Sequence, residues 1–124
     1  MANSKDILDN FSEKFPLLNK LYDLYEQMPQ IAKNEENTLR KSSEITVLEI
    51  IELVVIAARQ PKTDKSQTLI QAIRKLDTLK VFTDMAKELK VLNDSKYSEF
   101  QESLQSVGAM IGGWLKSAKA APAK

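Results

Sequence analysis

The segment ITVLEIIELVVIAA, residues 45–58, is the most apolar stretch of the chain and decides its fold class. Its 14 residues are too few to span a bilayer, and Glu49 and Glu52 interrupt it, so it predicts a buried core helix. The apolar residues cover more than one stripe of the helix surface, which is typical of a helix that is buried on more than one side. Either this helix lies at the centre of a bundle, or an additional face of it is buried in an oligomer.

The residues on either side of this segment mark the ends of its helix. A polar loop over residues 34–37 precedes it and Pro61 follows it. The other apolar residues recur at helical spacing in three further segments. We predict helices over residues 16–33, 38–59, 66–92 and 95–118. Pro29 lacks the N–H that a helix interior needs, so we expect it to kink or divide the first helix near Gln27 and Met28.

These helices predict an all-α fold, an antiparallel up-down-up-down four-helix bundle. Three glycines and four prolines are too few for the frequent turns of a sheet protein. Connections of about four to six residues place consecutive helices side by side and antiparallel. We expect one domain over residues 16–118, with an N-terminal extension over 1–15 and a flexible tail over 119–124.

The composition argues against an enzyme and against a metal site. The chain has no cysteine and no histidine, so it lacks the commonest metal ligands and the commonest general base. Glu49 and Glu52 lie three residues apart and offer carboxylate metal binding as a minor alternative to an ion pair with a lysine. We expect no cofactor and no catalytic residue. The N-terminus lacks the apolar region of a signal peptide, so the expected location is cytoplasmic, without a membrane partner.

Charge is spread unevenly although the net charge is only +1. Residues 1–50 hold six Lys/Arg and nine Asp/Glu, whereas residues 51–124 hold twelve and eight. The third helix carries five basic residues, of which Arg74, Lys87 and Lys90 are candidates for a basic strip, but acidic residues are interleaved with them. The other two basic residues are Lys75 and Lys80. These lysines and arginines therefore either contact phosphates or form an ordinary solvated face with their acidic neighbours.

Glycines close to the end of the fourth helix are the oddest local feature of the chain. Gly112 and Gly113 are adjacent, and each glycine in a helix interior costs roughly 1 kcal/mol relative to alanine. Gly108 lies one turn earlier, which gives a small-x-x-x-small pattern that permits close approach of another backbone. Trp114 follows at once and is large enough to anchor a contact. The alternative is a helix that thins out before its end, with Trp114 capping the core.

The same region carries a family resemblance. Residues 107–117, VGAMIGGWLKS, resemble the Gly-x-Met-x-Gly-Gly-Trp-x-Lys ending of the accessory variability determinant family, the bAvd four-helix-bundle proteins of diversity-generating retroelements. Further similarities are Tyr22-Asp23-Leu24-Tyr25 with Pro29 after it, Thr38-Leu39, Ala57-Ala58, Leu76-Asp77 with Leu79-Lys80, and Leu89, Val91, Leu92 and Tyr97. The resemblance covers roughly residues 15–118.

What the resemblance implies is a homo-oligomer, a pentameric barrel of bundles, that binds a reverse transcriptase and its template RNA or cDNA. Such a subunit is a non-catalytic accessory to mutagenic cDNA synthesis. Arg74, Lys80, Lys87 and Lys116 are then the candidate phosphate contacts, and Gly108, Gly112, Gly113 and Trp114 the candidate assembly or packing residues.

Two features of this chain differ from the family pattern. Family members are strongly basic, whereas this chain is almost neutral, and residues 33–37 carry two glutamates where the family has a basic, aromatic stretch. Of two arginines expected on the third helix, the matching positions are Lys80 and Asp84. The alternative function is therefore a protein–protein scaffold of the same fold that does not bind nucleic acid.

Overall fold

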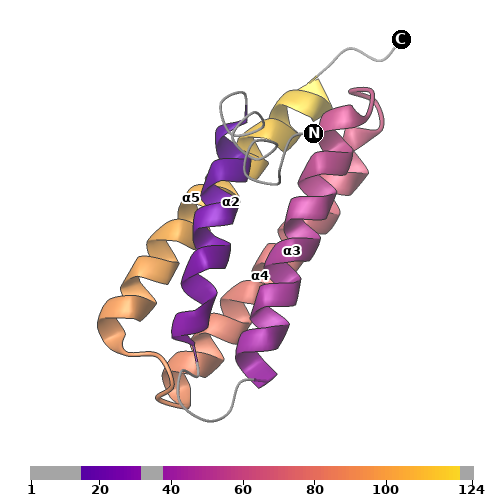
Figure 1. Ribbon diagram of the computed structural model, residues 1–124. Coiled ribbons are helices and arrows are strands. Elements are labelled where there is room, and N and C mark those ends of the chain that lie inside the picture. Colours follow the sequence, from indigo (N-terminus) through magenta and orange to yellow (C-terminus); the bar gives the residue numbers. More distant parts are fainter. Residues whose placement is uncertain (1–14, 32–37, 121–124) are drawn as a thin grey trace.

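The described part of the protein, residues 15–31 and 38–120 of a computed structural model, consists of helices joined by short turns (Figure 1). The predicted N-terminal extension and most of the predicted tail lie outside these residues. The helices are α2 (Pro16–Gln27), the short 3-10 helix η1 (Met28–Gln30), α3 (Thr38–Arg59), α4 (Lys65–Glu88) and α5 (Asp94–Ala120).

The four long helices form the predicted antiparallel up-down-up-down bundle. Each helix packs against the next one in the sequence, and α2 also packs against α5, so the four helices form a closed ring around one core. In Figure 1 the start of α2, the loop between α3 and α4, and the end of α5 all lie at the upper end of the bundle. The prediction of an all-α four-helix bundle is confirmed.

Pro29 divides the first helix as predicted. The α-helix ends at Gln27, and Met28–Gln30 continue it as one 3-10 turn, in which the Ile31 N–H donates to the Met28 carbonyl at 3.0 Å. Proline cannot donate to the carbonyl four residues earlier and its ring clashes there, so the regular helix stops before it. Ile31 is already extended, with ψ at 134°. The predicted range 16–33 was therefore too long.

The third predicted helix, 66–92, was also too long, because α4 ends at Glu88. Lys90 takes a left-handed conformation with φ at 61°, and the N–H groups of Lys90 and Val91 donate to the carbonyls of Lys87 and Ala86 at 3.0 Å. This is the Schellman arrangement that usually ends a helix at a glycine. Leu92, which lies after the end of the helix, is nevertheless buried in the core. The apolar pattern therefore extends beyond the helix itself.

Asn93 begins the last helix. Its side-chain oxygen accepts a hydrogen bond from the Lys96 N–H at 2.8 Å, the bond that an N-cap makes to the third helical residue. The helix then runs from Asp94 to Ala120, slightly beyond the predicted range 95–118 at both ends. This cap fixes where the chain turns back after α4.

The core is a single cluster to which all four helices contribute one apolar stripe. Its largest completely buried side chains include Leu21 and Leu24 of α2, Ile50 of α3, Leu76 and Leu79 of α4, and Phe100, Leu104 and Ile111 of α5. Three buried hydroxyls are satisfied by carbonyls one turn earlier in their own helices, at 2.8–2.9 Å: Ser43, Thr46 and Thr83. Burying them therefore leaves no unpaired hydroxyl in the core.

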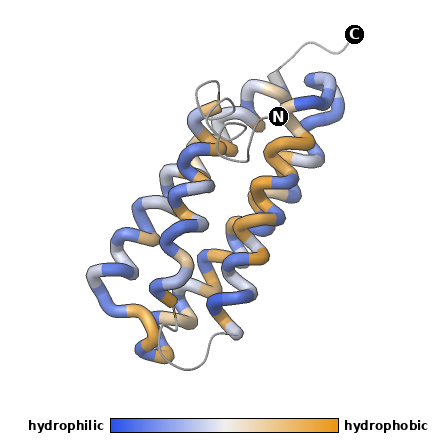
Figure 2. Tube along the Cα trace, in the orientation of Figure 1, coloured by the Kyte–Doolittle hydropathy of each residue, from blue (hydrophilic) through white to orange (hydrophobic). Residues whose placement is uncertain are grey.

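Helix α3 is not the central helix of the bundle, which corrects one of the two explanations for its apolar sequence. Only one stripe of α3 is buried, whereas Ile45, Leu48 and Ile56 are 56%, 47% and 42% exposed. Figure 2 shows this helix as the one with the most continuous hydrophobic colouring. In a ring of four helices every helix has an outer side, so the additional apolar residues of α3 face outward.

Candidate interaction surfaces

The three candidate phosphate contacts on α4 do not lie on one face. Lys80 and Lys87 are two turns apart on the side next to α5, whereas Arg74 lies about 120° around the helix from Lys80. Arg74 lines a shallow groove with Gln71, Lys75 and Thr78. The structure therefore brings Lys80 and Lys87 together and separates Arg74 from them.

Lys80 and Lys87 both have partners within the chain. The Lys80 ammonium lies 3.9 Å from an Asp77 carboxylate oxygen, and the Lys87 Nζ lies 4.4 Å from the centre of the Tyr97 ring. Lys116 is exposed near the other end of α5, about 30 Å along the bundle from Tyr97. The four candidate residues therefore do not form one continuous basic strip.

A small polar cluster joins α4 to the first turn of α5. The Tyr97 hydroxyl donates to Asp84 Oδ1 at 2.7 Å, while Lys87 covers the ring. The hydrogen bond to Asp84, followed by desolvation and the charge of the same carboxylate, raises the pKa of Tyr97 above its ordinary value of 10.0. The position that differs from the family pattern, Asp84, thus has a local structural role in this chain.

We expect this cluster to stabilise the fold in a pH-dependent way. Because the pKa of Tyr97 is higher in the folded chain than in the unfolded one, its contribution is fully present below pH 10.0 and is lost as the pH rises through the folded-state pKa. Asp84→Asn removes the charge and should return the pKa of Tyr97 toward its ordinary value. An absorbance titration of tyrosinate, with Tyr97→Phe identifying the signal, measures the change. An unchanged titration in Asp84→Asn would contradict the assignment.

Of the glycines, Gly108 is where α5 comes close to α4. A Cβ at Gly108 would lie 3.3 Å from Leu76 Cδ2, which is a tight contact. A Cβ at Gly112 or Gly113 would meet no atom of the described chain within 4 Å. Packing inside the described bundle therefore explains why a residue without a side chain suits position 108, but it does not explain the glycines at 112 and 113.

Trp114 joins three helices at the upper end of the bundle. Its ring is half-buried, meets the Phe15 ring edge-on at 5.1 Å between centroids, and lies 5.1 Å from the Lys65 Nζ. Phe15 precedes α2 and Lys65 begins α4, so Trp114 on α5 holds both starts in place. A shallow apolar groove of about 310 Å³ lies beside it, lined by Phe15, Pro16, Leu17, Met110 and Trp114.

Most of the exposed large apolar side chains of the described residues lie on α3 and α4, and we call this surface the α3–α4 face. It comprises Ile45, Leu48 and Ile56 on α3 and Val81, Met85 and Leu89 on α4, the last three being 55%, 44% and 64% exposed. Val81, Met85 and Leu89 also line a shallow groove of about 320 Å³. Because the helices are antiparallel, the first half of α3 lies beside the second half of α4. Sequence reasoning found the α3 part of this surface and missed the α4 part.

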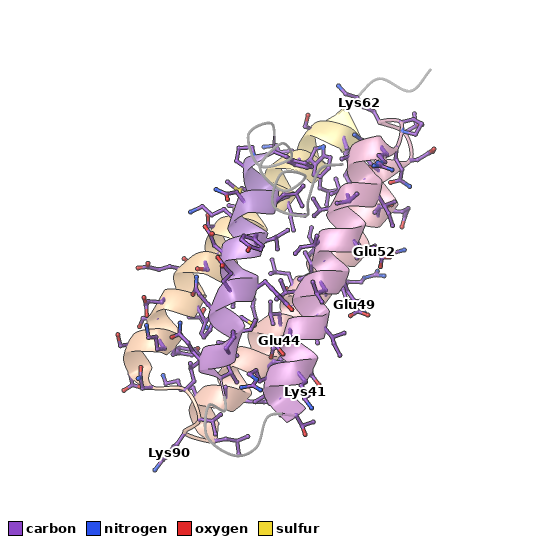
Figure 3. The ribbon with its side chains drawn as sticks, in the orientation of Figure 1. Lys41, Glu44, Glu49, Glu52, Lys62 and Lys90 are labelled. Atoms are coloured by element: carbon purple, nitrogen blue, oxygen red, sulfur yellow. The ribbon has the colours of Figure 1, made fainter. Side chains whose placement is uncertain are left out.

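Charged residues are interspersed along this face. Glu49 of α3 and Lys75 of α4 form an ion pair at 3.2 Å across the two helices, with both side chains almost half exposed. Figure 3 shows Glu44, Glu49 and Glu52 along α3. Glu49 thus has the lysine partner that was the alternative to a metal site, and no three described Asp or Glu residues are grouped so as to hold a metal ion.

The fold and these surfaces define a class of protein, an all-α four-helix bundle that exposes apolar side chains on α3 and α4. No described helix has both the length and the apolarity needed to cross a membrane. The family model described as bAvd-like matches residues 11–118, and the chain belongs to this family, as the Gly-Gly-Trp ending predicts. Comparisons with curated proteins and with solved structures find no significant match.

Proposed function

We propose that the protein is a non-catalytic accessory subunit of a diversity-generating retroelement. It acts as a homo-oligomer, a pentameric barrel, that binds the reverse transcriptase and its template RNA or cDNA and supports mutagenic cDNA synthesis. Membership of the bAvd-like family supports the accessory role. The single observation that carries the oligomeric part of the proposal is the exposed α3–α4 face.

An exposed face of this kind favours a second copy of the chain as its cover. Monomeric proteins seldom leave contiguous large apolar side chains in water, and such patches mark interaction sites. The face carries Glu52 on α3 and Arg74 on α4, both exposed and neither in an ion pair with a described residue. Glu52 of one copy and Arg74 of a neighbouring copy therefore offer opposite charges that can pair across a head-to-tail contact, the kind of contact that closes a ring.

A charge placed in the middle of the face should dissociate the oligomer. Leu48→Glu puts an unpaired carboxylate where the second copy is expected to pack, and burying such a charge is strongly unfavourable. We expect light scattering of the purified wild-type protein to give a multiple of 14.0 kDa, and of Leu48→Glu to give a monomer.

The matched control introduces the same charge on the opposite side of the bundle. Ser98 is exposed near the start of α5, far along the helix from Gly112 and Gly113, and α5 lies diagonally across the ring from α3, so Ser98→Glu should leave the oligomer intact. A monomeric wild-type protein, or equal dissociation by both substitutions, would refute the assignment of this face.

Binding to the polymerase and the RNA is tested separately. Coexpressed reverse transcriptase should copurify with the tagged wild-type protein, and the pair should retain template RNA at low salt and release it as salt rises. Absence of both interactions would overturn the retroelement assignment while leaving the oligomer untouched.

A second candidate function is favoured by one observation, the net charge of +1. A scaffold that binds only proteins does not need the excess of basic residues that neutralises phosphates. Such a scaffold would form an oligomer but would not retain RNA in a salt-sensitive way.

A further inference from the structure

Basic side chains gather at the upper end of the bundle, although they are far apart in the sequence. Segments 57–66 and 112–119 together carry five basic residues and one acidic residue, Asp64. The basic residues are Arg59, Lys62, Lys65, Lys116 and Lys119, which we call the basic end. Figure 3 shows Lys62 at this end, opposite Lys41 and Lys90.

Three elements bring these residues together. Arg59 ends α3, Lys62 lies in the following loop, and Lys65 begins α4. The contact between the Lys65 Nζ and the Trp114 ring, at 5.1 Å, holds the start of α4 against the last part of α5. Since Lys116 and Lys119 follow Trp114 within two helical turns, they lie at the same end as the loop (Figure 1).

The charges at this end are available to a ligand. Arg59, Lys62, Lys116 and Lys119 are exposed and Lys65 is half-buried. The ion pairs among described residues are Lys75–Glu49, Lys80–Asp77 and Lys96–Glu99, so none involves the basic end. Cations gathered at one end of the bundle repel one another, and an anion that binds among them relieves this repulsion.

The opposite end of the bundle shows that the clustering is not a general property of the surface. Residues 84–99 there alternate in sign, with three lysines and four acidic residues. Two of these form the ion pair between Lys96 and Glu99 at 3.1 Å. Asp84 binds the Tyr97 hydroxyl. Charge at that end is therefore largely compensated locally.

Helix dipoles explain the position of only some of the basic residues at this end of the bundle. Arg59 and Lys119 lie in the last turns of α3 and α5, where a cation is favoured. Lys65, in contrast, is the first residue of α4, and Lys62 lies just before it. A helix N-terminus is partially positive and disfavours cations, so these two lysines oppose the local field. An anion bound there would gain from the lysines and from the helix N-terminus together.

We propose that the basic end binds the phosphodiester backbone of single-stranded nucleic acid, independently of base sequence. The choice of nucleic acid rests on the proposed function, whereas the site itself rests on the charge cluster. A lipid surface fits less well, because the aromatic rings at this end, those of Phe15 and Trp114, are half-buried and pack against each other, and Ile56 is the one exposed large apolar side chain of the described residues that lies close to this end. Peripheral membrane binding normally adds such side chains to the basic ones.

The test compares two pairs of charge reversals that change the net charge equally. Lys62→Glu with Lys119→Glu alters the basic end, and Lys41→Glu with Lys90→Glu alters exposed lysines at the opposite end. Binding of a fluorescein-labelled, unstructured single-stranded RNA to the full chain is measured by anisotropy at low salt. Circular dichroism and light scattering check that fold and oligomer are unchanged.

We expect the first pair to weaken RNA binding by about tenfold or more and the second pair by no more than about twofold. The neutral pair Lys62→Gln with Lys119→Gln should make the plot of the logarithm of the RNA binding constant against the logarithm of salt concentration less steep. We expect its slope to fall in magnitude by about 1.4, because each phosphate contact to a single strand contributes about 0.7 to that slope. Equal losses in both charge-reversed pairs would overturn the site.

The control arms separate this inference from the proposed function. If both charge-reversed double variants still bind RNA equally well, the basic end is not the RNA-binding site, while the proposed accessory role is unaffected. Absence of RNA binding by the wild type, alone and with its polymerase, removes nucleic-acid binding altogether. Binding to vesicles of phosphatidylcholine with phosphatidylserine, in preference to RNA, would overturn the inference in favour of a membrane surface.

Discussion

Phe100→Ala is expected to lower the free energy of unfolding by about 3–5 kcal/mol, the range for removing a buried aromatic ring. Phe100 is 1% exposed and is among the largest completely buried side chains of the core. It lies early in α5, within two turns of the Asn93 cap, so its ring fills the core where the chain has just turned back from α4. The surrounding side chains belong to packed helices and can close the resulting cavity only in part.

Urea denaturation at fixed protein concentration measures this effect, because an oligomer makes the apparent stability depend on concentration. Phe82→Ala is the matched control, since the same atoms are removed from a half-buried position on α4. We expect Phe82→Ala to lower the free energy of unfolding clearly less than Phe100→Ala does. Equal losses would mean that Phe100 is not the more buried of the two in solution.

The second large effect has the opposite sign. Gly112→Ala with Gly113→Ala is expected to stabilise the fold by about 1–2 kcal/mol in total, because alanine has the higher helix propensity. Both positions lie inside α5 without a positive φ, and an added Cβ meets no described atom within 4 Å. Nothing in the described packing therefore opposes the gain.

Gly108→Ala is the internal control for this pair. Its Cβ would lie 3.3 Å from Leu76 Cδ2, so the leucine must shift and part of the propensity gain is lost. In thermal unfolding, we expect the Gly112/Gly113 double variant to have a higher melting temperature than the wild type and than Gly108→Ala. Light scattering of the same variants tests the assembly role: a more stable fold with a weakened oligomer would assign these glycines to a contact between copies.

The sequence predicted the fold because the loops carry strong local signals. The polar residues 34–37 and Pro61 place α3 at Thr38–Arg59, the bounds that the structure gives. The end of α4 was missed because Lys90 occupies a left-handed position usually taken by glycine, and lysine gives no sign of it in a sequence. Leu92, buried beyond that point, continued the apolar pattern past the helix.

The candidate surfaces were less accessible to sequence reasoning, because they depend on which helices are neighbours. Arg74 and Lys80 lie close in sequence but on different sides of α4, and the partners of Lys80 and Lys87 reduce their free charge. The basic end shows the opposite case: Lys62 and Lys119 are far apart in the sequence, and only the folding of the bundle places them at the same end of the molecule. A periodicity argument detects neither arrangement.

The ring order of the helices also has a kinetic consequence. The most extensive packing joins helices that follow one another in the chain, α3 with α4 and α4 with α5. Contacts of low sequence separation form quickly, because little loop entropy is lost in making them. Closure of α2 against α5 joins the two helices that are farthest apart in the sequence, so we expect it to form later than the packing of α3 with α4 and of α4 with α5. Leu21 and Leu24 of α2 are completely buried in the folded chain, so a delay in this closure would lengthen the time for which part of the core faces water.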